Sequence, residues 1–254
     1  PTQAIRAVIS PIIEALRSKI IICVSKGIEA DSLMLPCEIL SSLLGKEIKN
    51  KVAILSGPSF AVEIMEKQPT AVTVAGFKKE TAHLVQNLFH TPYFRAYISE
   101  DPIGVEIAGA LKNVIAIAAG ACVGLGFKSN SSAALITRGL AELTRIGAAF
   151  GAKSLTFNGL AGIGDLMLTC TSQKSRNFRI GYLIAEGKPL QEAKESLGSV
   201  AEGVTTTKTA FLLAKKHNIR TSIIKAVYQV LYENWDLQKA LEELLTGSAK
   251  HELE

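Results

Sequence analysis

A long apolar segment near the middle of the chain most limits what the chain can fold into. Residues 103–125 are almost all apolar or small, and a run of roughly 20 such residues is long enough to cross a membrane as a helix. Glu106, Lys112 and Asn113 interrupt this run, however, and such side chains are costly in lipid when no second span can pair with them. We therefore expect no membrane span in this chain.

The pattern of strands and helices changes at about residue 102. Before it, short runs of apolar and β-branched residues predict strands at 20–24, 52–55, 70–76 and 93–99. Helical patterns alternate with these strands at 3–17, 32–45, 59–66 and 78–90. Short strands that are apolar on both faces and alternate with helices predict a parallel α/β sheet.

Beyond residue 102 the sequence shows only helical patterns. They cover residues 102–123, 131–150, 155–169, 176–186, 189–198, 202–217, 221–233 and 236–246. In these segments apolar residues recur at the three- and four-residue spacing of an amphipathic helix. We therefore predict an α/β domain at residues 1–101, followed by an all-helical domain at residues 102–254.

Charge and composition indicate the class of partner. The 254 residues include 28 basic and 23 acidic side chains, so the net charge is +5, and the excess is spread along the chain. A nucleic-acid site usually needs a clustered basic stripe with aromatic residues, which make up only 6% of this chain. We expect a phosphorylated or carboxylated small molecule rather than a nucleic acid.

The cysteines and histidines indicate neither disulfides nor a metal site. These residues are Cys23, Cys37, Cys122 and Cys170, with His83, His90, His217 and His251. No two cysteines have CxxC spacing, and Cys23 and Cys122 lie in apolar runs where a free buried thiol is usual. The histidines lack the spacing of metal ligands. We expect a reducing, cytosolic compartment and no bound metal.

Lys112 is the first candidate for a chemical role. On a helical wheel it belongs to one stripe of small and polar residues, which consists of Gly109, Lys112, Asn113, Ala116 and Gly120. In one interpretation Lys112 reaches water or pairs with a carboxylate such as Glu106, and the glycines allow close helix packing. In the other, Lys112 is an acid/base group, because burial lowers a lysine pKa toward neutrality, and Asn113 hydrogen-bonds a substrate oxygen.

A second cluster lies around the start of the helix predicted at 176–186. Three glycines precede Asp165, and Thr169 follows it by one helical turn, so the two side chains can share a face. Ser175, Arg176 and Asn177 then stand at the helix N-terminus, where backbone N–H groups, a hydroxyl and a guanidinium can bind an oxyanion or a phosphate. The alternative is an ordinary serine N-cap beside a solvated arginine.

Two further candidate segments for a ligand site follow predicted strands, and a third begins a predicted helix. Lys26 follows the strand at 20–24, and the Ser-Gly-Pro-Ser run that ends at Ser59 follows the strand at 52–55. Ligands usually bind at the carboxyl ends of strands in an α/β sheet. Residues 200–203, Val-Ala-Glu-Gly, begin another helical pattern.

Taken together and in order, these segments resemble the bacterial NAD(P)-dependent glycerol-3-phosphate dehydrogenases. The matching motifs are SKGIE at 25–29, SGPSFAVEI at 56–64, GVEIAGALKNVIAIAAG at 104–120, ALITRGLAE at 134–142, GLAGIGDLMLTCTSQKSRN at 159–177 and VAEG at 200–203. No motif is specific alone, but the ordered set covers nearly the whole chain. The resemblance implies part of a Rossmann-type sheet domain followed by an all-helical domain.

The resemblance also implies a reaction. Enzymes of this family transfer a hydride reversibly between NADH or NADPH and the C2 carbonyl of dihydroxyacetone phosphate. The product, sn-glycerol 3-phosphate, is a precursor of phospholipids. The resemblance further implies a homodimer.

The family's functional positions fall on particular residues of this chain. By resemblance Lys112 is the acid/base residue, and we expect Asp165, Asn113 and Thr169 to assist it. The implied substrate positions are Lys26, Gly57, Ser59, Lys112, Asp165, Ser175, Arg176 and Asn177. The implied cofactor positions are Lys26, Ala61, Arg176, Val200 and Glu202.

The sequence departs from the family pattern at its start. Family members begin with a strand, a GxGxxG turn and a helix that hold the cofactor pyrophosphate, and the 254 residues do not include this unit. We therefore expect these residues alone to be impaired in cofactor binding and activity. Two other interpretations remain open: a non-catalytic helical module that dimerises through segments such as 133–149, and a related β-hydroxyacid or 6-phosphogluconate-type dehydrogenase.

Overall fold

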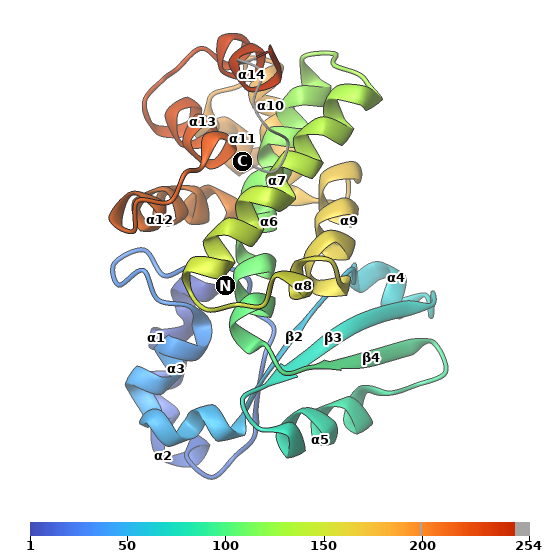
Figure 1. Cartoon of the computed structure of the whole chain (residues 1–254), viewed down its shortest axis with the longest axis vertical. Helices are drawn as coiled ribbons and strands as arrows, with labels where there is room; N and C mark the ends of the chain where they lie inside the picture. The colour runs from blue at the N-terminus through green and yellow to red at the C-terminus, as the bar shows by residue number, and fades with distance from the viewer. Residues whose placement is uncertain (199, 247–254) are drawn as a thin grey trace.

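The computed structural model describes residues 1–198 and 200–246, and it divides them into a sheet domain and a helical domain (Figure 1). The strands of the sheet are β1 (Ile21–Cys23), β2 (Val52–Ser56), β3 (Thr70–Gly76) and β4 (Phe94–Ser99). They lie in the order β1-β2-β3-β4. The predicted α/β domain followed by a helical domain is confirmed.

The sheet is mixed, which differs from the parallel sheet expected from the sequence. β1 and β2 are parallel, as are β3 and β4, but β2 and β3 are antiparallel, with Ala53 opposite Gly76. The reason lies in α4 (Ala61–Met65), which joins β2 to β3. Five helical residues rise only about 7 Å, too little to carry the chain back along a strand of about 17 Å. The next strand therefore starts where β2 ends and runs the opposite way.

Helices cover both faces of the sheet. These are α1 (Ile5–Ile9), α2 (Ile13–Leu16), α3 (Pro36–Leu44) and α5 (Lys79–Phe89). Alternate residues of β2 face opposite sides, since Val52 and Ile54 belong to the cluster that contains α3, and Ala53 and Leu55 to the one that contains α5. The helix predicted at 3–17 is broken into short pieces by 3-10 turns, one of which contains Pro11.

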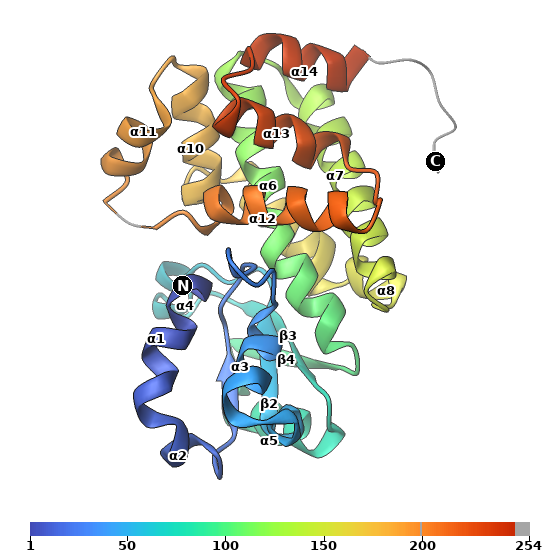
Figure 2. The ribbon, with the colours of Figure 1, turned by 90° about the vertical axis from the view of Figure 1, so that its left-hand side faces the viewer.

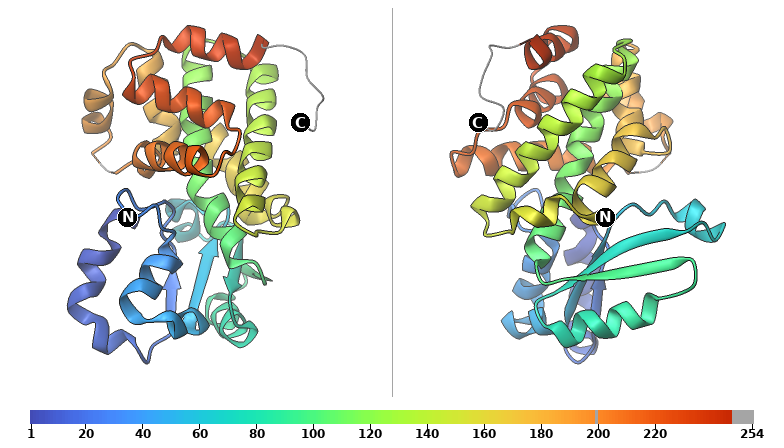
Figure 3. Two further views of the ribbon diagram at one scale, coloured as in Figure 1. Left: turned by 60° about the vertical axis from the view of Figure 1, so that its left-hand side comes forward. Right: turned by 45° about the vertical axis from the view of Figure 1, so that its right-hand side comes forward.

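The helical domain is arranged around α6 (Figures 1 and 2). Its helices are α6 (Pro102–Gly124), α7 (Ser129–Ala149), α8 (Ser154–Phe157), α9 (Asp165–Thr171), α10 (Arg176–Ala185), α11 (Leu190–Ser196), α12 (Glu202–Lys216), α13 (Ser222–Tyr232) and α14 (Leu237–Thr246). Figure 3 shows α6, in green, running from the sheet domain up through the bundle. Within the described residues it is the one helix long and apolar enough to cross a membrane, and 89% of its most apolar stretch is buried inside the protein.

The helix predicted at 155–169 is divided by its glycines. The chain forms the short helix α8, then a π-helical turn at Leu160–Gly164, and then α9. A side chain at Gly162 would overlap the backbone of Phe157, so the tight turn requires glycine there. This turn places Asp165 at the first position of α9, where its carboxylate reaches Lys26 of the sheet domain.

Two glycines let α6 and α10 cross with their backbones in contact. A Cβ added at Gly120 would overlap the carbonyl oxygen of Phe178, and one added at Gly181 would overlap that of Ile117. The stripe on α6 therefore has two uses along its length. Near Gly120 it serves helix packing, whereas a Cβ at Gly109 would meet the side chains of Ser56 and Lys26.

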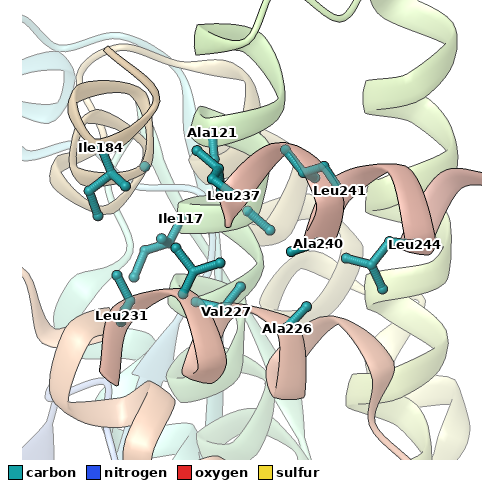
Figure 4. Close-up of a pocket in the computed structure, with 13 residues that line it drawn as sticks. Ile117, Ala121, Ile184, Ala226, Val227, Leu231, Leu237, Ala240, Leu241 and Leu244 are labelled. Atoms are coloured by element: carbon teal, nitrogen blue, oxygen red, sulfur yellow. The ribbon is translucent and has the colours of Figure 1, made fainter. Parts of the chain in front are cut away.

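The outer helices α13 and α14 close the bundle over α6 and α10 (Figure 4). They leave a cavity of about 20 Å³ whose lining is entirely apolar and includes Ile117, Ile184, Leu231 and Leu241. Such a volume holds one water at most, and a water there would find no polar side chain to bond. The cavity is therefore a small gap in the packing of the hydrophobic core rather than a ligand site.

We expect Gly181→Ala to lower the free energy of unfolding by about 1–3 kcal/mol or more, because the added methyl group forces α6 and α10 apart. Urea unfolding monitored by circular dichroism measures this change. The matched control is Gly164→Ala, where φ is −60° and the nearest neighbours of an added Cβ are 3.7 Å away. That change should be neutral or stabilise by up to about 1 kcal/mol. Equal effects of the two variants would contradict the packing assignment.

Candidate active site

Lys112 is buried at the centre of the molecule. It lies on α6 and is only 7% exposed. Its Nζ donates hydrogen bonds to Oδ1 of Asp165 at 2.6 Å and to Oγ1 of Thr169 at 2.8 Å. Thr169 in turn donates to the backbone oxygen of Asp165 at 2.6 Å, so the two α9 residues share a face as predicted. Lys112 therefore does not extend to water, and its carboxylate partner comes from α9.

A second lysine approaches the same carboxylate from the sheet domain. Lys26 follows β1, and its Nζ lies 2.6 Å from Oδ2 of Asp165 and 3.5 Å from the carbonyl oxygen of Gly57. Asn113, adjacent to Lys112 on α6, donates from Nδ2 to the carbonyl oxygen of Lys26 at 3.4 Å. Each oxygen of Asp165 thus faces one ammonium group, and the pairing ties the two domains together.

The electrostatics of this group lower the pKa of Lys112 from 10.5 to about 8. Burial is the largest cause, since it disfavours the charged ammonium, and the positive charge of Lys26 acts in the same direction. The negative charge of Asp165 and its hydrogen bond oppose the shift. A lysine with such a pKa carries a proton at neutral pH and releases it far more readily than a surface lysine.

Glu106, the other carboxylate considered for Lys112, has a different partner. Its Oε1 accepts a hydrogen bond from the backbone N of Cys37 at 2.9 Å, near the start of α3. Its other oxygen is buried and lacks a hydrogen-bond partner among the described residues. Burial raises the pKa of Glu106 to about 7. This residue fastens α6 to the sheet domain.

The turn after β2 forms one wall of the site. Gly57 has φ +143°, and a Cβ there would lie 2.9 Å from the Cα of Val72, so glycine is required. Ser59 donates from Oγ to the carbonyl oxygen of Gly57 at 3.0 Å. Ala61 is the exposed first residue of α4. The structure thus places these three predicted residues on a single segment beside Lys26.

The start of α10 carries three predicted residues in different environments. Ser175 is buried and accepts a hydrogen bond from the backbone N of Phe178 at 3.2 Å, which is the N-cap geometry weighed as an alternative. Arg176 is exposed. Asn177 is buried, and its Oδ1 accepts from the backbone N of Gly203 at 2.9 Å. The side chains of Ser175 and Asn177 are therefore engaged in the fold, and Arg176 is the exposed cation of the three.

The start of α12 approaches the end of β1. Oε2 of Glu202 accepts a hydrogen bond from the backbone N of Thr2 at 3.0 Å, and a Cβ at Gly27 would lie 2.8 Å from that oxygen. Val200, two residues before Glu202 in the sequence, is exposed. Glu202 therefore lies next to the Ser-Lys-Gly run that carries Lys26.

Sequence reasoning missed two polar residues at this junction. The hydroxyl oxygens of Thr2 and Ser56 are buried and lack hydrogen-bond partners among the described residues. Thr2 lies against Gly27, and Ser56 ends β2 and faces Gly109. Ser56 was part of a quoted motif and Thr2 of none, and only the contacts between distant segments reveal that both lie at the junction.

The four cysteines lie in the interior of the protein. All four thiols are free and buried. Among residues 1–198 and 200–246 there is no group of three His, Cys, Asp or Glu side chains that could hold a metal ion.

Comparison with known families gives two matches along the chain. Residues 1–82 match the model of the NAD-dependent glycerol-3-phosphate dehydrogenase N-terminus. Residues 101–242 match the model of the NAD-dependent glycerol-3-phosphate dehydrogenase C-terminus. The two models together cover most of the chain.

Individual proteins give the same result. The chain is 49% identical over 99% of its length to the glycerol-3-phosphate dehydrogenase [NAD(P)+] of Citrifermentans bemidjiense, of which it covers 76%. It is 46% identical to that of Bacillus subtilis over its whole length and 74% of the relative. The crystal structure of glycerol-3-phosphate dehydrogenase from Coxiella burnetii superposes with a TM-score of 0.91, at 40% identity, over 96% of this chain and 74% of that one.

We expect Asp165→Asn to lower the free energy of unfolding by about 3–5 kcal/mol, because it removes the charge that pairs two lysines in a largely buried site. Chemical unfolding at pH 7 measures the loss. Glu192→Gln is the matched control, since Glu192 pairs with Lys188 on the surface at 3.3 Å and should change stability by less than about 1 kcal/mol. A loss for Asp165→Asn no larger than that of the control would contradict the shared-carboxylate geometry.

Proposed function

Because this chain belongs to the family of NAD-dependent glycerol-3-phosphate dehydrogenases, we propose that Lys112 is its acid/base residue in the reversible reduction of dihydroxyacetone phosphate to sn-glycerol 3-phosphate. The chain is an NAD(P)-dependent oxidoreductase of that family, and its substrate is a phosphorylated small molecule. The observation that carries the proposal is the buried lysine of α6, whose ammonium group contacts Asp165 and Thr169 of α9 beside Lys26 at the end of β1.

The residues around Lys112 account for both directions of the reaction. The reduced nicotinamide, when bound, supplies the hydride that reaches the C2 carbon. Lys112 donates its proton to the C2 oxygen as negative charge develops there. In the reverse direction the neutral amine of Lys112 accepts the proton of the C2 hydroxyl. Asp165 and Thr169 hold the Nζ atom in place, and Asn113 hydrogen-bonds a substrate oxygen.

The remaining substrate positions surround the phosphate end. Arg176 and the N-terminus of α10, which Ser175 and Asn177 fix, provide a cation and backbone N–H groups for an oxyanion. Lys26 adds a second ammonium group from the sheet domain. Gly57 and Ser59 complete the substrate site, because their segment runs beside Lys26.

The junction also fits the nicotinamide part of NAD or NADP. Among the described residues the buried hydroxyls of Thr2 and Ser56 have no hydrogen-bond partner, so polar atoms remain for a polar ligand near the strand ends. The residues that would hold the cofactor are Lys26, Ala61, Arg176, Val200 and Glu202. Ligands of α/β sheets bind at such strand ends.

Domain limits, assembly and location complete the proposal. We propose that residues 1–101 are part of the Rossmann-type cofactor domain and that residues 102–254 are the helical domain that carries Lys112. Of the latter, residues 199 and 247–254 lie outside the described residues. We expect a homodimer, for which sedimentation equilibrium would give twice the mass of the chain. We expect the protein to work in the cytoplasm, where its buried thiols stay reduced.

We expect Lys112→Met, made in a protein that also carries the GxGxxG unit, to lower kcat for dihydroxyacetone phosphate about 10²–10⁴-fold, because general acid catalysis is lost. The assay follows oxidation of NADH or NADPH by absorbance. Lys188→Met removes a surface lysine and should leave kcat unchanged. Turnover of Lys112→Met at the normal rate would show that another group donates the proton.

The pH profile should reflect the lowered pKa of Lys112. Reduction needs the ammonium form, so its rate should fall as the pH rises through about 8. Oxidation of sn-glycerol 3-phosphate needs the neutral amine, so its rate should rise over the same range and level off above it. Because Asp165 raises the pKa of Lys112, both transitions should move to lower pH in Asp165→Asn. Profiles that stay flat up to pH 10 would contradict this assignment.

A further inference from the structure

An ion pair joins the two domains on the surface, away from Lys112. Nζ of Lys174 lies 2.8 Å from Oε1 of Glu63. Glu63 belongs to α4, at the end of the sheet nearest α9 (Figure 1), and Lys174 belongs to the loop between α9 and α10. Both side chains are partly exposed, at 36% and 56%. The contact joins residues 111 positions apart in the sequence.

Each partner is attached to one wall of the proposed substrate site. Glu63 follows the segment of Gly57, Ser59 and Ala61 by two residues. Lys174 directly precedes Ser175 and Arg176. The position of α4 relative to the start of α10 therefore sets the width of the site between these two walls.

The loop that carries Lys174 is a turn rather than a loose connection. The backbone N of Lys174 donates to Oγ of Ser172 at 3.1 Å, and the backbone N of Ser175 donates to the carbonyl oxygen of Ser172 at 3.0 Å. Ser175 then caps α10. Because these hydrogen bonds fix Lys174 relative to Ser175, the position of the Lys174 side chain is coupled to the position of the α10 N-terminus and of Arg176.

The acidic face of α4 matches the charge of Lys174. The hydrogen bond and the negative charge of Glu63 raise the pKa of Lys174, and the charge of Glu66 acts in the same direction. Two carboxylates of the sheet domain thus attract one ammonium of the helical domain.

We propose that Glu63 and Lys174 form a latch that holds the two walls of the substrate site at their working separation and so strengthens binding of the phosphorylated substrate. The inference rests on the proposed function. Both are positioning residues, since neither touches the reacting group. The latch strengthens binding because segments that are already held in position lose less conformational entropy when the substrate binds.

A competing role for Lys174 is direct contact with the substrate phosphate, and the two roles predict opposite results. If the pair is a latch, Glu63→Gln weakens substrate binding. If Lys174 binds the phosphate directly, Glu63→Gln releases the ammonium and strengthens binding. Exchange of the two charges, Glu63→Lys with Lys174→Glu, restores a latch but places a carboxylate where direct binding needs a cation.

The test is calorimetric titration of the full chain with sn-glycerol 3-phosphate at low ionic strength. Glu66→Gln serves as the background, so that residue 66 does not repel the exchanged carboxylate. Glu63→Gln and Lys174→Met should each raise Kd about two- to fivefold, as expected for an exposed ion pair, and the exchange should restore Kd. In steady-state assays KM should rise in the same proportion, with a smaller change in kcat.

The matched control exchanges Lys188 and Glu192, a surface ion pair at 3.3 Å, and should leave the Kd for sn-glycerol 3-phosphate unchanged.

The outcomes separate this proposal from the proposed function. Binding by the background chain, with a Kd that neither single variant changes, overturns the latch alone. Tighter binding by Glu63→Gln, or an exchange that fails to restore Kd, also overturns it. If the wild-type chain does not bind sn-glycerol 3-phosphate, the substrate assignment fails and the latch fails with it.

Discussion

The structure depends on one carboxylate that two lysines share. Asp165 accepts from Lys112 with one oxygen and from Lys26 with the other, each at 2.6 Å. A carboxylate at this depth is stable only when cations and hydrogen bonds compensate its burial, and the second lysine in turn lowers the pKa of the first. One carboxylate thus joins the sheet domain to the helical domain, and it supports the charged form of Lys112 against the burial that lowers the pKa of that lysine.

The rest of the fold keeps α6 rigid enough for this geometry. At its N-terminus Asp101 accepts from the backbone N of Gly104 and from that of Lys153, both at 2.9 Å, which fastens α6 to the start of α8. At the other end the glycines at 120 and 181 bring α6 and α10 into backbone contact. Lys112 lies between these two fixed points, so the position of its Nζ is determined by packing on both sides.

The sequence predicted what depends on local pattern and missed what depends on distant contacts. The bounds of β3, the extent of α6 and the shared face of Asp165 and Thr169 follow from residue spacing, and the structure agrees. The antiparallel β2–β3 pairing, the π-helical turn before α9 and the partner of Glu106 depend on where separate segments meet. The residue patterns left the roles of the site residues open between two interpretations, the family resemblance favours the chemical one, and these roles remain predictions.

The pKa of Lys112 tests the central claim most directly. Nitrogen-15 labelling of lysine and an NMR titration would follow its side chain in the wild-type chain and in Asp165→Asn. We predict a pKa of about 8 in the wild type and a lower value in the variant, because the carboxylate supports the charged form. A wild-type value near that of an ordinary lysine, or no difference between the two proteins, would contradict the account of a buried lysine governed by one shared carboxylate.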